Sequence, residues 1–225
     1  DGLNDLIIGA PHKNSYTGAV YVILGSSLGS NKTINLSSAD YTFVGESDSD
    51  YSGGSVSGAG DVDGDGLDDL IVGAFREGSA GHWAGAAYVI LGSSLGSSET
   101  KSLSSADYKL VGSVDYFVGR SVSGAGDVDG DGLDDLIVGA PYKDSTAGAA
   151  FVMLASDLAE SATIKLPTAA SYKLLGKEES DSAGGAVSAA GDVDGDGRGD
   201  LLVGAIGVDD GGSAAGVAYL ILTGG

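Results

Sequence analysis

One acidic motif recurs along the chain and determines what it can fold into. The sequence GDVDGDGLDDLIVGA occupies residues 60–74 and returns unchanged at 126–140. Residues 191–205 repeat it with three changes, and residues 1–10, DGLNDLIIGA, resemble its second half. The complete copies start 66 and 65 residues apart. A period of this length predicts a repeat protein in which each repeat is one supersecondary unit packed on the next.

Four short apolar segments recur in the same order around each acidic motif. In one repeat they are residues 54–60, 69–74, 85–92 and 108–112. Each is rich in β-branched, aromatic or small residues, and Gly, Ser or Asp bounds it, which is typical of strands. Four strands per repeat without a helical period predict an all-β fold built from four-stranded antiparallel sheets, the blades of a β-propeller.

The repeat period divides the chain into one propeller region, residues 1–225, with four parts. We expect a partial blade at 1–45 (strands two to four), complete blades at 46–112 and 113–176, and a partial blade at 177–225 (strands one to three). Propellers close with 4–8 blades. A small imperfect ring, an assembly of two chains or a piece of a longer protein would each accommodate these 14 strands, and the start inside a motif favours the last.

The charge of the chain excludes several classes of partner. There are 32 acidic residues against 11 Lys and Arg, giving a net charge of −21. Such a surface repels nucleic acids and anionic membranes, and we expect no membrane insertion because no apolar run approaches the roughly 20 residues that span a bilayer. Cysteine is absent, so thiolate metal sites and disulfides are excluded. Acidic loops without cysteine fit an exported protein, at the cell surface or secreted.

The acidic loop has the ligand pattern of a calcium site. Asp61, Asp63 and Asp65 alternate along a tight turn, Gly66 lets the backbone reverse, and Asp69 closes the set. With a backbone carbonyl from residue 67 and a water, these carboxylates supply the 6–8 oxygens that Ca²⁺ prefers. Mg²⁺ fits less well because it demands octahedral geometry, and the lack of His and Cys disfavours zinc and copper. A solvated acidic turn is the alternative, but three copies in register argue against it.

The loop differs from an EF-hand in a useful way. Its twelfth position is Val72, where an EF-hand has a bidentate Glu, and strands rather than helices flank it. The sequence therefore predicts a calcium-binding β-hairpin. We expect the ion to be structural, since the clustered carboxylates would repel one another without it.

These motifs resemble FG-GAP repeats, the blades of integrin α-subunit propellers and of many bacterial surface proteins. GAP at residues 9–11 and 139–141 matches one family signature, whereas Phe75 and Ile206 replace Pro in the other copies. The second signature keeps Gly54, Gly119 and Gly185 but lacks the preceding Phe. The resemblance implies three complete calcium sites and a truncated one (Asp1, Leu3, Asp5); the complete sites comprise Asp61, Asp63, Asp65, Leu67 and Asp69; Asp127, Asp129, Asp131, Leu133 and Asp135; and Asp192, Asp194, Asp196, Arg198 and Asp200. Integrins also have seven blades and a partner subunit.

The loops on the face opposite the calcium hairpins vary most between repeats. They contain the only Trp and both His residues of the chain. We hypothesise that this face binds a protein or glycan partner, since aromatic residues and Arg dominate interface energetics. Filling of gaps between blades is an equally weighted alternative. The candidate residues are His12, Tyr16, Tyr51, Arg76, His82, Trp83, Tyr116, Phe117 and Tyr142.

Two short motifs carry little weight. Arg198-Gly199-Asp200 spells an integrin-recognition tripeptide, but its aspartate is the closing ligand of the third loop. Asn31 and Asn35 begin glycosylation sequons, which matter only in a host that glycosylates them.

No catalytic arrangement is visible in the sequence. His12 and His82 lie in non-equivalent loops, and the carboxylate pairs belong to the calcium loops. We therefore expect a calcium-stabilised extracellular binding or adhesion module without catalysis of its own. A structural repeat that self-associates through open blade edges is one alternative, and an accessory propeller of a larger secreted hydrolase or lyase is another.

Overall fold

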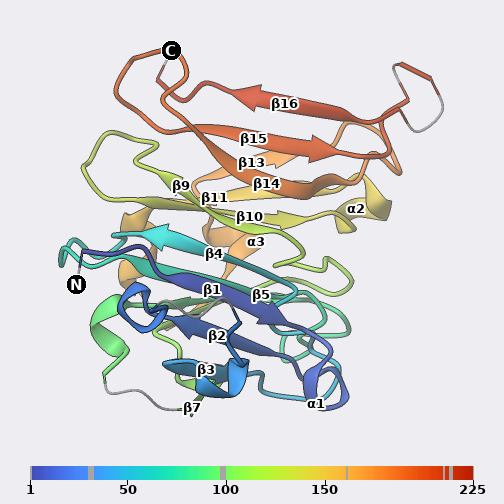
Figure 1. The fold of residues 1–225 in the computed structure, drawn as a ribbon. Helices are drawn as coiled ribbons and strands as arrows, with labels where there is room; N and C mark the ends of the chain where they lie inside the picture. Colours follow the sequence, from blue (N-terminus) through green and yellow to red (C-terminus); the bar gives the residue numbers. More distant parts are fainter. Residues whose placement is uncertain are drawn as a thin grey trace.

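The chain forms four β-sheets that lie side by side (Figure 1). The computed structural model describes residues 2–29, 33–96, 100–160, 162–209, 211–212 and 215–224. Within these residues the sheets follow one another in sequence order, and the first lies near the N-terminus and the fourth at the C-terminus. The predicted all-β fold of propeller blades is confirmed.

Each sheet is a meander of antiparallel strands that recur in the order predicted from the repeats. The first sheet contains β1 (Leu6–Ala10), β2 (Ala19–Ile23) and β3 (Tyr41–Val44), and the second β4 (Ser55–Gly60), β5 (Asp69–Ala74), β6 (Ala86–Ile90) and β8 (Tyr108–Val111). The third contains β9 (Val122–Gly126), β10 (Asp135–Ala140), β11 (Ala149–Met153) and β13 (Tyr172–Leu175), and the fourth β14 (Ala183–Gly191), β15 (Asp200–Ala205) and β16 (Val217–Ile221).

Two further strands join the sheets in a way that the sequence did not predict. β7 (Thr100–Ser102) pairs in parallel with β3, and β12 (Thr163–Lys165) pairs in parallel with β8. Both lie in the Ser-rich connections that precede the outermost strands β8 and β13, yet each pairs with the preceding sheet. The four-stranded antiparallel pattern is therefore incomplete as a description, because the second sheet has five strands and the first gains a parallel one.

The helices are short and lie in the connections. The α-helical turns are α1 (Lys13–Tyr16), α2 (Lys143–Thr146) and α3 (Leu166–Ala169). The 3₁₀ turns are η1 (Gly25–Ser27), η2 (Leu36–Ser38), η3 (Gly92–Ser94), η4 (Leu103–Ser105) and η5 (Ala155–Glu160).

The apolar core is a set of layers between neighbouring sheets. Val20 and Phe43 of the first sheet pack with Tyr88 of the second, and Leu110 of the second packs with Phe151 of the third. A further layer joins the third and fourth sheets. Full burial of each such side chain contributes roughly 1.5–3 kcal/mol. Each sheet is therefore stabilised by its neighbours.

Glycines allow the sheets to approach closely near the strand ends. A Cβ atom built on Gly73 of β5 would lie 2.1 Å from the carbonyl oxygen of Gly119, which precedes the third sheet. The same contact joins Gly9 to Gly53 and would place a Cβ 2.0 Å from that carbonyl oxygen. Gly204 of the fourth sheet is different, because its nearest neighbour, Ala186, would be 3.5 Å away. The glycine of the Gly-Ala signature is therefore required where a following sheet packs against it.

Alanine substitution should show whether this glycine is required for close packing between sheets or only for backbone flexibility. Gly73→Ala forces two backbones apart and should lower the free energy of unfolding by on the order of 2–3 kcal/mol. Gly204→Ala, the matched control, should change it by no more than about 1 kcal/mol. Urea denaturation followed by circular dichroism measures both, and equal effects would contradict the packing argument.

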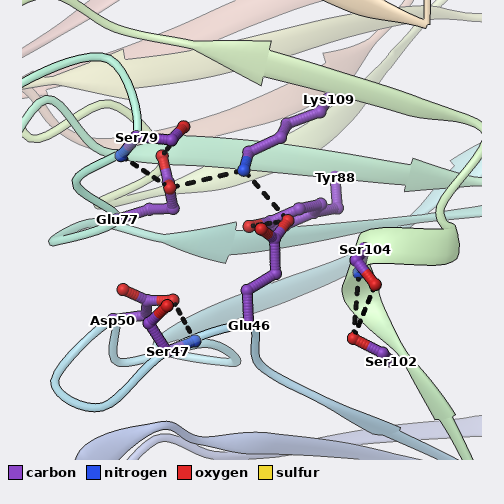
Figure 2. Close-up of polar contacts among 9 residues, drawn as sticks. All are labelled: Glu46, Ser47, Asp50, Glu77, Ser79, Tyr88, Ser102, Ser104 and Lys109. Atoms are coloured by element: carbon purple, nitrogen blue, oxygen red, sulfur yellow. Dashed lines mark hydrogen bonds and ion pairs between the residues drawn. The ribbon is translucent and has the colours of Figure 1, made fainter.

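A cluster of charged side chains joins the loops of the first and second sheets (Figure 2). The Lys109 ammonium lies 2.9 Å from Glu46 Oε1 and 3.3 Å from Glu77 Oε1. The Tyr88 hydroxyl also donates to Glu46, at 2.9 Å. Burial and the Glu46 carboxylate raise the pKa of Tyr88, so this hydroxyl stays protonated. Glu46 follows β3 whereas Tyr88 and Lys109 belong to β6 and β8, so the cluster fastens the first sheet to the second.

Asp50 lies beside this cluster and is only 4% exposed. One carboxylate oxygen accepts the Ser47 N–H at 2.8 Å. Burial, reinforced by Glu77 and Glu46, raises the pKa of Asp50 to about 6. Its ionised form is therefore unfavourable in the folded protein.

The raised pKa of Asp50 gives a predictable pH dependence. The cost of ionisation is absent below about pH 4, where the carboxyl is protonated in both states, and grows as the pH rises through 6. Asp50→Asn, which does not titrate, should therefore gain on the order of 2 kcal/mol relative to the native chain between about pH 4 and 7. Urea denaturation across this range in excess calcium measures the difference. The exposed Asp48→Asn serves as control, and a parallel pH profile for native and Asp50→Asn chains would contradict the assignment.

Candidate calcium sites and the opposite face

The acidic motifs form the hairpin loops that join the first two strands of the second, third and fourth sheets. In the loop between β4 and β5, Gly64 and Gly66 have φ angles of +77° and +85°. These left-handed conformations are readily available only to glycine. They let the chain reverse around Asp61, whose carboxylate accepts the N–H groups of residues 64–66. The other two loops have the same pair of left-handed glycines.

The aspartate that closes each predicted ligand set, here called the fourth aspartate, is completely buried and connects three segments. Asp69 Oδ2 accepts the Val62 N–H at 2.8 Å, and its Oδ1 accepts the Gly92 N–H, beyond β6, at 2.8 Å. Asp135 and Asp200 are likewise 0% exposed and make the equivalent pairs of bonds. Burial raises the pKa of Asp69 and raises that of Asp135 to about 6, and neighbouring aspartates of the same loop add to both shifts.

Three carboxylates converge in each loop. Ligand oxygens of Asp61, Asp63 and Asp69 lie within 4.8 Å of one another. The corresponding trios of the other loops, Asp127, Asp129 and Asp135, and Asp192, Asp194 and Asp200, converge to the same extent. Oxygens at this separation can all reach one ion at the 2.3–2.6 Å typical of Ca²⁺. The donor set is purely oxygen, which suits calcium rather than zinc or copper.

The remaining predicted ligands lie beside these trios. The third aspartates accept backbone N–H groups from the residues predicted to give carbonyl ligands: Asp65 from Leu67 at 2.8 Å, Asp131 from Leu133 and Asp196 from Arg198, both at 2.9 Å. The convergent trios do not include the third aspartates. Their place in a metal site therefore stays a prediction.

The truncated copy is represented by Leu3 and Asp5, because Asp1 lies outside the described residues. Asp5 Oδ1 accepts the Gly25 N–H at 2.7 Å, the counterpart of the bond from Gly92 to Asp69. Asp5 thus has the position of a fourth aspartate. Asn31 also lies outside the described residues, whereas Asn35 is exposed and its side chain accepts the Ser37 N–H.

The acidic loops of neighbouring sheets also contact each other. Asp134 Oδ2 accepts the Asp61 N–H at 2.9 Å, and the Asp134 N–H donates to the Asp61 carbonyl at 3.1 Å. In the next pair of loops the Gly199 N–H donates to the Asp127 carbonyl at 2.7 Å. The first ligand residue of one loop is therefore held by the following loop. The Arg198-Gly199-Asp200 tripeptide lies within this contact and its aspartate is buried, so it is not presented to a partner.

The opposite face presents a row of contacting rings, here called the aromatic row. Tyr16 stacks on Tyr51 with ring centroids 5.1 Å apart, and Tyr51 lies 5.1 Å from Phe75. Phe75 lies 6.4 Å from Phe117, which lies 4.6 Å from Tyr142. The row therefore crosses loops of the first three sheets.

Other predicted residues flank this row. Trp83 lies 5.4 Å from Phe117 and 4.0 Å from His82, and His12 lies 5.3 Å from Tyr16. Tyr116 is separate, since it packs against the core and beneath the Lys143 ammonium. Tyr16, Trp83 and Tyr142 remain 40–46% exposed. The row thus fills space between sheets and also presents exposed rings. Gap filling and partner binding, the two interpretations of the sequence, therefore each describe part of it.

The backbone holds several of these rings in unusual conformations. Tyr16, Tyr51, Trp83 and Phe117 have φ angles between +45° and +65°. Bulky residues rarely adopt this region, and such strain clusters at functional sites.

Sequence analysis missed two members of this surface. Phe75 is part of the aromatic row, and the Arg120 guanidinium lies 5.4 Å from its ring centroid. Phe75 stands where the family signature has Pro, and this replacement is the sequence signal by which Phe75 could have been found.

Comparison with known proteins agrees with this arrangement. Residues 52–90 and 118–153 match the FG-GAP repeat family. Integrin alpha-5 of Xenopus laevis is 32% identical over 219 residues, which cover 93% of this chain and 19% of that protein. Integrin alpha-PS5 of Drosophila melanogaster is 34% identical over 172 residues, 75% of this chain and 16% of that protein. Integrin alpha pat-2 of Caenorhabditis elegans is 31% identical over 224 residues, which cover 91% of this chain and 17% of that protein.

The chain spans about a fifth or less of the length of these relatives. The matched segments begin just before the inner strands β4 and β9 and include the acidic hairpins that follow them. The chain therefore contains FG-GAP repeats and is similar, over most of its own length, to integrin α-subunits.

Proposed function

We propose that the chain is a calcium-stabilised extracellular binding or adhesion module without catalysis of its own. The observation that carries the proposal is the convergence of three aspartates in each of three equivalent hairpins. Its similarity to integrin α-subunits supports a role in adhesion. The described helices are all short, and none of them could cross a lipid bilayer. Blade boundaries after residues 45, 112 and 176 remain part of the proposal.

Calcium would act on the folded state through the fourth aspartate. Asp69 connects the hairpin to the end of β6, yet burial and its neighbours disfavour its ionised form. An ion between Asp61, Asp63 and Asp69 would neutralise this repulsion and hold the connection. Stability and calcium binding should therefore be linked.

Loss of one converging carboxylate should weaken this linkage. Calcium at about 100 times its Kd should raise the free energy of unfolding by about 2.7 kcal/mol for each site. Asp63→Asn should lose most of the gain from one site, because Asp63 belongs to the first trio. Thermal unfolding with calcium and with EDTA measures the gain.

Asp68→Asn is the matched control for this experiment. It removes one charge from the same loop, but Asp68 is exposed and lies outside the trio. Equal calcium responses of the two variants, or no response of the native chain, would remove calcium from the proposal.

The aromatic row is the proposed partner surface. Its exposed rings lie on the face away from the acidic hairpins, and a rigid scaffold presents them on loops. Tyr16 and Tyr142 lie near its two ends and are each 46% exposed. The proposed partner is a protein or a glycan of the cell surface or extracellular matrix.

Adhesion should depend on these exposed rings. Beads carrying the chain should adhere to a surface coated with extracellular matrix in calcium, and Tyr16→Ser with Tyr142→Ser should reduce adhesion at least several-fold, since aromatic anchors dominate interfaces. Bead counts after controlled washing measure the effect. Tyr172→Ser is the control, because Tyr172 is 51% exposed on the outer strand β13. Unchanged adhesion of the double variant would disprove the proposed surface.

Self-association is a second candidate, favoured by one observation. The fourth sheet ends at β16, where Tyr219 and Leu220 are 45% and 47% exposed. Beside them, a groove of about 540 Å³ includes Leu174 and Leu175 of β13. An open apolar sheet edge is suited to pairing with another strand. A concentration-independent monomer in light scattering would eliminate this candidate.

A further inference from the structure

A hollow of about 510 Å³ lies beside Trp83, between loops of the first and second sheets. One side is formed by residues 46–50 and the other by residues 76–79, His82 and Trp83. Figure 2 shows the carboxylates of Glu46, Asp50 and Glu77 around this region. None of its residues belongs to an acidic hairpin, so the hollow is separate from the candidate calcium sites.

The positions most favourable for a cation are filled by the chain itself. Lys109 lies between Glu46 and Glu77. The Arg76 guanidinium lies 4.9 Å from the Tyr51 ring centroid and 5.1 Å from that of Trp83. A basic side chain from a partner would have to displace these groups to gain the same interactions.

The hollow still offers unpaired hydrogen-bonding groups of both kinds. Asp50 is 4% exposed, and within the described residues only its Oδ2 accepts a hydrogen bond. The Arg76 side chain lines the hollow and is partly exposed, and it makes ring contacts but no ion pair or side-chain hydrogen bond among those residues. A buried acceptor and a guanidinium donor therefore line one hollow, and each lacks a complementary group.

These groups discriminate between classes of ligand. A cation would donate to Asp50 but has no acceptor for Arg76. An anion would accept from Arg76 but meets the four carboxylates of the lining and has no donor for Asp50. A hydroxyl group both donates and accepts. A ring with several hydroxyls would satisfy both groups while its apolar face covers the exposed part of Trp83.

We propose that this hollow binds a neutral saccharide residue of a glycan, with Asp50 and Arg76 bonding its hydroxyls and Trp83 packing against its ring. The proposal rests on the binding function proposed above and selects glycan as the ligand class. Its volume lies within the range of small-ligand sites, about 300–1,000 Å³. Local structure supports it, because the backbone at Trp83 has a φ of +45°, and this conformation positions the indole.

The single Trp of the chain makes the test direct. Methyl glycosides of glucose, galactose, mannose, fucose and N-acetylglucosamine are titrated to about 10 mM in calcium buffer, enough to detect a Kd of about 1 mM. At least one glycoside should change the Trp83 fluorescence saturably. Acetyl-arginine amide and acetyl-lysine amide serve as cationic probes and should not compete with it.

Two variants test the assigned groups. Arg76→Met keeps an apolar stem against the rings, and Asp50→Asn keeps an acceptor for the Ser47 N–H. Each variant should lower the affinity for the glycoside at least ten-fold. Glu178→Gln, at a residue of the third-to-fourth-sheet loop that does not line the hollow, should leave binding unchanged. Calcium-dependent melting of every variant shows that it folds.

The outcomes separate this inference from the proposed function. Failure of every glycoside to bind, tighter binding of an arginine or lysine amide, or unchanged affinity in both variants would overturn the saccharide assignment. The adhesion and calcium measurements do not depend on this hollow, so the binding module itself would stand in each of these cases.

Discussion

The fold depends on carboxylates that are buried within β-hairpins by hydrogen bonds to backbone N–H groups. Asp69, Asp135 and Asp200 each bind the turn behind them and the end of the third strand of their sheet. Two more aspartates converge on each of them. Each buried carboxylate is thus attracted to backbone N–H groups and repelled by the neighbouring carboxylates. A divalent cation is the simplest species that removes this repulsion while leaving the hydrogen bonds in place.

The two faces of the sheets have different chemistry for a topological reason. Antiparallel strands place the acidic hairpins on one face and the loops between their second and third strands on the other. Asp134 and Asp61 link neighbouring hairpins through backbone contacts, which leaves little freedom on the acidic face. The opposite loops also share backbone contacts between neighbouring sheets, because Gly18 pairs with Ser52, Gly85 with Val118 and Gly148 with Ala183. Their side chains differ, however. These loops contain the aromatic row and the carboxylates of Glu46 and Glu77 that meet Lys109, so variation between repeats concentrates there.

Repeat spacing was sufficient to predict the sheets, their strand order and the convergence of three of the four predicted ligand aspartates in each complete loop, because these features follow from a local pattern present in every copy. Contacts unique to one pair of sheets were not predictable in this way. Lys109 of β8 reaches Glu46 and Glu77 only because two connections meet beside this strand, and the residues come from distant parts of the sequence. The strands β7 and β12 were missed because each has three residues and pairs outside its own repeat. Tyr116 was grouped with the candidate partner-binding residues, yet tertiary packing places it against the core.

The parallel strands have a consequence for how such a chain changes in length. β7 and β12 each close the outer edge of the sheet before them, and they occupy equivalent positions in successive repeats. The first and second sheets therefore each receive their last strand from the repeat that follows. Whole repeats can be duplicated or lost without creating a new kind of junction, whereas a break within a repeat exposes an edge in two sheets at once. The exchange of strands thus makes a unit of about 65 residues the smallest piece that can be added or removed cleanly.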